Sequence, residues 1–219
     1  MNFLGHIYLS GPDTELAIGN LVADQIKGNR ISELPDKIKS GIVLHRLIDE
    51  FTDNHISYKK CVRELFPKYR HYSRVIIDMY FDHFLAANWD NFHKTPLKIY
   101  SNSFYEKLEK SCFYFNDQVQ YFICNLINQK WLEKYSNLKD LEVILKQMEG
   151  RTKFPSKLAA STYDLIEKYT YFKSHFFHLP ELKASSRKRS ERFFKLFSSS
   201  TFKRFLLSIT PNSGATLDA

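Results

Sequence analysis

Glycine and proline, the residues that most often end helices, are scarce along this chain. Each occurs seven times in 219 residues, and the prolines fall between apolar segments. Within those segments apolar side chains recur every three or four residues, the spacing of one helix face, and few stretches alternate as strands do. The sequence therefore predicts an all-α fold, a compact multi-helix bundle.

The helix boundaries are expected at turn and capping signals. Gly28 and Asn29 follow one apolar helix, and Pro155 stands where the first turn of another should begin. We expect helices over residues 14–27, 35–53, 55–65, 71–91, 96–112, 116–134, 138–148 and 155–178.

The distribution of charge separates a body from a tail. The net charge is +8, yet residues 183–204 alone carry eight lysines and arginines and one acidic residue. We expect residues 1–182 to form one all-helical domain, and residues 183–219 to form a basic amphipathic extension with a disordered end. Because most of the positive charge lies in the tail, nucleic-acid binding by the body is not expected.

The chain shows no signal for secretion or membrane insertion. Its start lacks the basic and apolar regions of a signal peptide, and no stretch reaches the roughly 18 apolar residues of a membrane span. The three cysteines fit neither a disulfide framework nor a CxxC metal knuckle. We therefore expect a cytoplasmic protein with reduced thiols.

Histidine and aspartate recur on otherwise apolar segments within the first 83 residues. On one predicted helix, His45, Asp49 and Thr52 share a face, and Asp53 adjoins them. A second predicted helix carries Asn20, Asp24 and Lys27 on one face. A third carries Asp78, Asp82 and His83, and His6 lies near the start of the chain.

A divalent metal ion would explain carboxylates and imidazoles on apolar helices. Burial of unpaired polar groups costs free energy, which coordination offsets. Oxygen and imidazole ligands fit Mn²⁺, Mg²⁺ or Fe²⁺ better than a structural zinc site. The ion would polarise a phosphoryl oxygen, and Arg46 or Lys27 could bind the phosphoryl group. Each pair also has an ordinary explanation, as a helix cap or a buried structural network, so a non-catalytic helical binding protein stays an alternative.

Four segments, taken in order and spacing, resemble the acyl carrier protein phosphodiesterases, also called acyl carrier protein hydrolases. They are MNFLGHIYLS at residues 1–10, GNLVAD at 19–24 followed by Lys27 and Gly28, GIVLHRLIDEFTD at 41–53, and DMYFDHFL at 78–85 with Trp89 shortly after. The resemblance runs to about residue 190 and is much weaker after residue 95.

The resemblance implies hydrolysis of the phosphodiester that joins 4′-phosphopantetheine to a serine of holo-acyl carrier protein, giving the apo protein. It implies a Mn²⁺-dependent family that is distantly related to the HD phosphohydrolases. The residue order Asp82–His83 reverses the HD pair, so the metal geometry of HD enzymes is not carried over. The implied metal ligands are His6, Asp24, His45, Asp49, Asp82 and His83; the implied catalytic residues are Asp24, Lys27, Arg46 and Asp53; the implied supporting residues are Asn20, Thr52 and Asp78.

The implied partner is acidic, so a basic surface would favour its encounter. Residues 59–74 contain six basic residues and one acidic residue, Glu64, and are either a docking surface or an ordinary solvated helix face. Two alternatives remain: an HD-like phosphohydrolase acting on a nucleotide or other small phosphodiester, and a protein that binds RNA or membranes through the tail. The candidate docking residues are Lys59, Lys60, Arg63, Lys68, Arg70 and Arg74.

Overall fold

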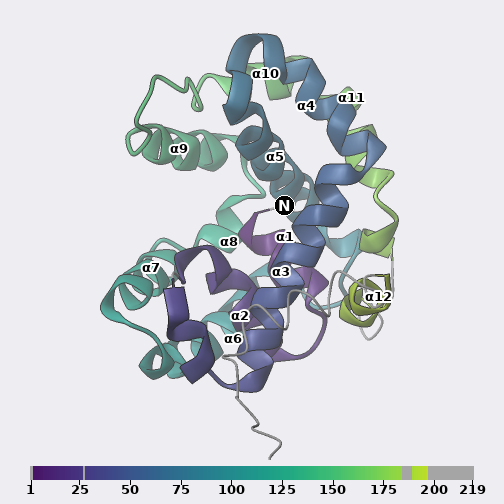
Figure 1. The fold of residues 1–219 in the computed structure, drawn as a ribbon. Helices are drawn as coiled ribbons and strands as arrows, with labels where there is room; N and C mark the ends of the chain where they lie inside the picture. The colour runs from purple at the N-terminus through teal and green to yellow at the C-terminus, as the bar shows by residue number, and fades with distance from the viewer. Residues whose placement is uncertain (1, 27, 184–188, 197–219) are drawn as a thin grey trace, which may run out of the picture.

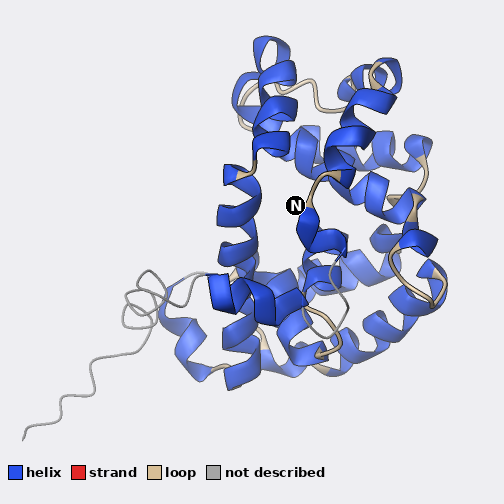
Figure 2. Cartoon of the chain, turned by 90° about the vertical axis from the view of Figure 1, so that its right-hand side faces the viewer, coloured by secondary structure: helices blue, strands red, loops and turns tan. Residues whose placement is uncertain are grey.

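The computed structural model describes residues 2–26, 28–183 and 189–196, and all regular secondary structure within them is helical (Figures 1 and 2). This confirms the prediction of an all-α fold. None of the described helices has both the length and the apolar character needed to cross a membrane.

Three helices from the start of the chain form the centre of the fold. They are α1 (Phe3–Leu9), α2 (Thr14–Val22) and α3 (Asp36–Asn54). The carboxylate of Asp13 accepts a hydrogen bond from the N–H of Leu16 and so begins α2. Figure 1 shows α3 rising from the bottom of the view through the middle of the molecule, with the start of the chain beside it.

Two glycines allow α2 and α3 to pack backbone against backbone. A methyl group at Gly19 would lie 2.0 Å from the carbonyl oxygen of Ile38, and one at Gly41 would lie 2.2 Å from that of Leu16. Larger residues would force these helices apart. The close crossing places Asn20 against His45, and the functional site is built on that contact.

An aromatic core joins α4 (Ile56–Tyr69) and α5 (Ser73–Ala87) to α10 (Ser161–Glu167) and α11 (Tyr169–Phe177). The ring of Phe81 contacts both Tyr58 and Phe176 edge-on, and Tyr80 contacts Phe172 in the same way. All five rings are buried. This core fixes α4 and α5 next to the C-terminal half of α3.

A second group of helices covers the other side of the start of the chain. It contains α6 (Leu97–Lys110), α7 (Asp117–Asn128), α8 (Trp131–Lys134) and α9 (Leu138–Glu149), which lie to the left and below in Figure 1. Short 3₁₀ helices make several connections: η1 (Ala23–Gln25), η2 (Gly28–Glu33), η3 (Arg70–Tyr72), η4 (Trp89–Asn91), η5 (Cys112–Tyr114) and η6 (Pro180–Lys183).

Helix α12 (Arg189–Leu196) belongs to the predicted extension and packs against α3. Its Phe193 is 1% exposed and contacts Phe51 of α3 edge-on, with ring centroids 5.8 Å apart. Arg192 and Lys195 lie on its exposed side. Residues 197–219, including the end predicted to be disordered, lie outside the described residues.

Several helices end where local sequence signals do not predict it. Helix α4 continues through Pro67 to Tyr69, because buried Leu65 and Tyr69 hold its last turns in the core. The helix predicted over residues 14–27 ends at Val22 and continues as η1. The helix predicted over 116–134 is interrupted at Lys130, which is in the left-handed conformation. The helix predicted over 155–178 begins at Ser161 and not at Pro155, and it is interrupted at Lys168.

Candidate active site

His45 lies on the buried face of α3, where α3 crosses α2. Its Nδ1 atom is 2.9 Å from the carbonyl oxygen of Asn20 and 3.2 Å from the side-chain oxygen of the same residue. Because both of these atoms are acceptors, Nδ1 carries a hydrogen and donates it. The Nε2 atom of His45 is therefore left to contact the carboxylates of Asp24 and Asp49.

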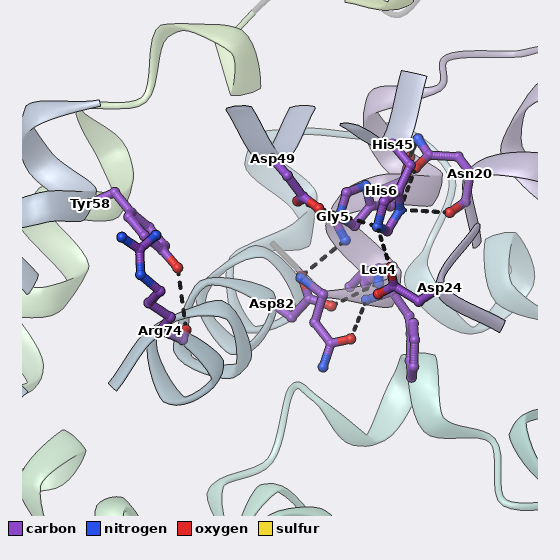
Figure 3. A network of polar contacts seen from close by, with 12 residues as sticks. Leu4, Gly5, His6, Asn20, Asp24, His45, Asp49, Tyr58, Arg74 and Asp82 are labelled. Carbon is purple, nitrogen blue, oxygen red and sulfur yellow. Dashed lines mark hydrogen bonds and ion pairs between the residues drawn. The ribbon is translucent and has the colours of Figure 1, made fainter. Parts of the chain in front are cut away.

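His6 reaches the same point from α1. Its ring stacks on that of His45, with centroids 4.0 Å apart and planes inclined by 16° (Figure 3). Asn20 fixes the backbone there, because its side-chain amide donates to the carbonyl oxygen of His6 at 2.9 Å. His6 is buried, so packing as well as hydrogen bonding sets its position.

Asp49 follows His45 by one helical turn and joins the two rings. One of its carboxylate oxygens lies 3.2 Å from Nε2 of His6, and the other lies 3.2 Å from Nε2 of His45. Asp24, in η1, adds a second carboxylate, whose Oδ1 lies 3.3 Å from the same atom of His45. Three helical elements thus converge on one point.

The charges of this group follow from burial and from its contacts. Burial lowers the pKa of His6 to about 4, and the nearby His45 adds to this effect. Burial also opposes the charged form of His45, but hydrogen bonds to Asp24 and Asp49 outweigh it and raise the pKa of His45 to about 9. Burial would raise the pKa of Asp49, yet hydrogen bonds from His45 and His6 hold it well below its usual range. At neutral pH the metal-free group therefore has a protonated imidazole between two carboxylates.

The group has the donors that a divalent cation needs. The candidate ligand atoms of His6, His45 and Asp49 all lie within 4.8 Å of one another, and no other set of three such residues does so in the described part of the chain. Loss of one proton from His45 would free its Nε2 as a ligand. Two imidazole nitrogens with carboxylate oxygens suit Mn²⁺ or Fe²⁺.

A cleft of about 360 Å³ adjoins the group. One end is formed by His45 and Asp49 of α3 together with Asp24. Farther along α3, Asp53 faces the same space. The other lining side chains include Phe3, Tyr58, Arg74, Asp78 and Met148.

Comparison with known proteins identifies the family. The family described as acyl carrier protein phosphodiesterase matches residues 1–182. This chain belongs to the acyl carrier protein phosphodiesterase family. A Photorhabdus laumondii protein of that name is 32% identical over 178 residues, covering 80% of this chain and 89% of its own length. Proteins of the same name from Pectobacterium atrosepticum and Salmonella newport are 28% and 29% identical, covering 78% and 87% of this chain and 90% and 100% of their own lengths. No solved structure matches the chain significantly.

The family match contains every residue of the group. The match ends before α12. Phe51 therefore lies inside the matched region and its contact Phe193 lies outside it.

The structure does not bring Asp82 to the group, although the sequence suggested it as a ligand. Its carboxylate accepts hydrogen bonds from the backbone N–H groups of Leu4 at 2.8 Å and Gly5 at 3.0 Å. Asp82 thus caps the start of α1 and holds the helix that presents His6. Burial raises the pKa of Asp82 to about 7, and these N–H groups oppose that rise.

His83 likewise lies away from the group. Its Nδ1 atom is 2.8 Å from the carbonyl oxygen of Tyr135, and its Nε2 atom is 3.1 Å from the hydroxyl of Tyr169. Both ring nitrogens therefore have protein partners, which explains its burial without an ion. Helical periodicity placed Asp82 and His83 on an apolar helix but could not show what lies opposite them.

The remaining candidates separate into those in the cleft and those outside it. Asp53 and Asp78 line the cleft, whereas Thr52 is buried in α3 and does not line it. Arg46 is exposed and is not a lining residue either. Lys27 lies outside the described residues.

The sequence does not indicate the residues at one end of the cleft. Its pattern gives no role to Tyr58 and predicts only a docking role for Arg74. The hydroxyl of Tyr58 donates to the carbonyl oxygen of Arg74 at 3.4 Å (Figure 3). The Arg74 guanidinium pairs with Asp53 at 2.6 Å. No sequence signal links these residues, because they come from three different helices.

The predicted docking residues are exposed, but acidic residues neutralise part of their charge. Lys68 pairs with Asp164 at 2.7 Å, and Arg74 pairs with Asp53 at 2.6 Å. Within the described part of the chain, no acidic side chain pairs with Lys59, Lys60, Arg63 or Arg70, and all four are exposed.

Proposed function

We propose that this chain hydrolyses the phosphodiester that links 4′-phosphopantetheine to a serine of holo-acyl carrier protein, and releases the apo protein. The observation that carries the proposal is the convergence of His6, His45 and Asp49 beside a cleft, in a member of this family. We infer that the enzyme acts in the cytoplasm as a phosphoric diester hydrolase.

The proposal includes a divalent ion, for which Mn²⁺ is our first choice and Mg²⁺ or Fe²⁺ the others. His6, His45 and Asp49 would hold it. Asp24 is the fourth candidate ligand, because its Oδ1 lies 3.3 Å from Nε2 of His45. The bound ion would polarise a phosphoryl oxygen and lower the pKa of a water molecule.

The residues behind these ligands fix their orientation. The backbone and side-chain oxygens of Asn20 accept the hydrogen on Nδ1 of His45, so that Nε2 of His45 faces the cleft. The same side chain holds the backbone of His6. Asp82 holds the first turn of α1 through two backbone N–H groups. These contacts join four helices, α1, α2, α3 and α5, so the ligand positions are set by the fold before any ion binds.

The substrate is an acidic protein, and we propose that it approaches over α4, where Lys59, Lys60 and Arg63 are exposed. The opposite charges would increase the association rate more than the final affinity. Raising the salt concentration should therefore raise KM and leave kcat little changed.

Mass spectrometry of holo-acyl carrier protein incubated with the purified chain and Mn²⁺ tests the function. The carrier should lose the mass of phosphopantetheine, and EDTA should prevent the loss. If the carrier is unchanged while small phosphodiesters are hydrolysed, the substrate assignment is wrong and a small-molecule phosphohydrolase is favoured. If neither reacts and no ion binds, a non-catalytic helical protein is favoured.

A further inference from the structure

The cleft presents a charge problem for a phosphodiester. Four carboxylates line it: Asp24, Asp49, Asp53 and Asp78. A phosphodiester carries a negative charge, so these groups repel it unless cations face it. An ion at His6, His45 and Asp49 would supply positive charge at one end only.

Arg74 is the only lysine or arginine among the described residues that line this cleft. Its side chain is 58% exposed, so the guanidinium retains donors that are open to a ligand. Arginine presents several N–H groups in one plane, which fits two phosphoryl oxygens at once.

The structure holds Arg74 at both of its ends. Its guanidinium Nη1 lies 2.6 Å from Oδ2 of Asp53, and its carbonyl oxygen accepts a hydrogen bond from the Tyr58 hydroxyl at 3.4 Å. Tyr58 is buried and packs edge-on against Phe81, so it is a rigid support. Figure 3 shows Tyr58 and Arg74 together at the left of the view, apart from the histidine pair at the right, with Asp49 between them.

Asp53 connects this arginine to the candidate ligands. It follows Asp49 by four residues on α3, so the two carboxylates lie on the same face, one turn apart. The guanidinium that Asp53 holds therefore lies about one turn of α3 farther along the cleft than Asp49.

We propose that Arg74 is the phosphate-binding residue of this site and contacts a non-bridging oxygen of the phosphodiester, with Asp53 and Tyr58 as its positioning residues. The inference rests on the proposed function, because it assumes a phosphodiester in this cleft. It replaces Arg46, which is exposed outside the cleft, in the role of phosphate contact.

Binding of 4′-phosphopantetheine to the Mn²⁺-loaded protein, measured by calorimetry, tests the inference without requiring turnover. Arg74→Ala should weaken this binding by about tenfold to a hundredfold, since it removes charge-assisted hydrogen bonds. Binding of pantetheine, which has no phosphate, should not change. Arg74→Lys should restore part of the loss, as a point charge without the planar fork.

Arg151→Ala is the matched control, because Arg151 is an exposed arginine outside the cleft lining. It should bind 4′-phosphopantetheine as the unmodified chain does. Circular dichroism melting of each variant should show that it is folded.

Two results would overturn the inference. Unchanged 4′-phosphopantetheine affinity in Arg74→Ala, with a raised KM for holo-acyl carrier protein, would mean that Arg74 contacts the carrier protein. Unchanged affinity and unchanged KM would remove Arg74 from substrate binding altogether. A failed carrier assay together with an Arg74-dependent affinity would refute the substrate assignment and leave the phosphate contact standing, so the two failures are distinguishable.

Discussion

The rings of His6 and His45 stack with centroids 4.0 Å apart, although they come from different helices, and both Nε2 atoms meet the carboxylate of Asp49. Two buried imidazoles at this distance cannot both carry a proton at low cost. The arrangement therefore favours one neutral ring and one charged ring, and a divalent ion can take the place of the single proton.

Proton release on metal binding follows from the pKa of His45. That pKa is about 9 in the metal-free protein, and only the neutral ring can bind an ion. Below pH 9 the Mn²⁺ affinity should rise about tenfold per pH unit and then level off, with about one proton released. Calorimetry in buffers of different ionisation enthalpy measures this, and His45→Gln serves as the comparison. Mn²⁺ binding to the unmodified chain below pH 9 without release of a proton would contradict it.

The stability of the metal-free protein should change with pH in the opposite direction. Because folding raises the pKa of His45 above its ordinary value of 6.5, its contribution to stability is fully present below pH 6.5. That contribution should disappear as the pH rises through about 9. Denaturant unfolding in EDTA between pH 6 and 10 should show the decline in the unmodified chain and a smaller one in His45→Gln. Equal slopes for both proteins would show that His45 is not the group responsible.

The crossing of α2 and α3 depends on Gly41. In Gly41→Ala the new methyl group would meet the backbone oxygen of Leu16 at 2.2 Å, so the helices must separate. We expect a loss of about 3 kcal/mol or more in unfolding free energy and weaker Mn²⁺ binding. Gly150→Ala is the control, because the nearest atom to its methyl group is 3.7 Å away. Unfolding midpoints in urea measure both, and equal midpoints would refute the close crossing.

Asp82 should behave as a helix cap and not as a ligand. In Asp82→Asn one of the acceptors for the N–H groups of Leu4 and Gly5 is lost, which should cost about 1–3 kcal/mol of stability. The folded variant should still bind about one Mn²⁺ ion per chain. Loss of the ion with unchanged stability would return Asp82 to the ligand set.

Helix α12 should contribute to the stability of the body. Phe193→Ala removes a buried ring that contacts Phe51 and should cost about 3 kcal/mol. Arg192→Ala, an exposed change one residue away, should cost little. Thermal melting compares the two, and an unchanged midpoint for Phe193→Ala would show that α12 is dispensable.

Local pattern predicted the helices better than it predicted the partners of their polar residues. The period of 3.6 residues showed that α3 carries His45 and Asp49 on one face, and the structure places both in the candidate site. The same period could not show that α1 begins against Asp82, because that contact joins residues far apart in the chain. The pairing of Arg74 with Asp53 was missed for the same reason.

The most direct test of the account compares Asp49→Asn with Asp36→Asn in one assay. Both carboxylates are on α3, but Asp36 is 97% exposed at its start, whereas Asp49 joins His6 to His45. Bound Mn²⁺ is measured by elemental analysis, and removal of phosphopantetheine from holo-acyl carrier protein by mass spectrometry. We predict that Asp36→Asn keeps the ion and the activity, and that Asp49→Asn loses the ion and at least about a hundredfold in rate. Full activity in Asp49→Asn would contradict the assignment of the site.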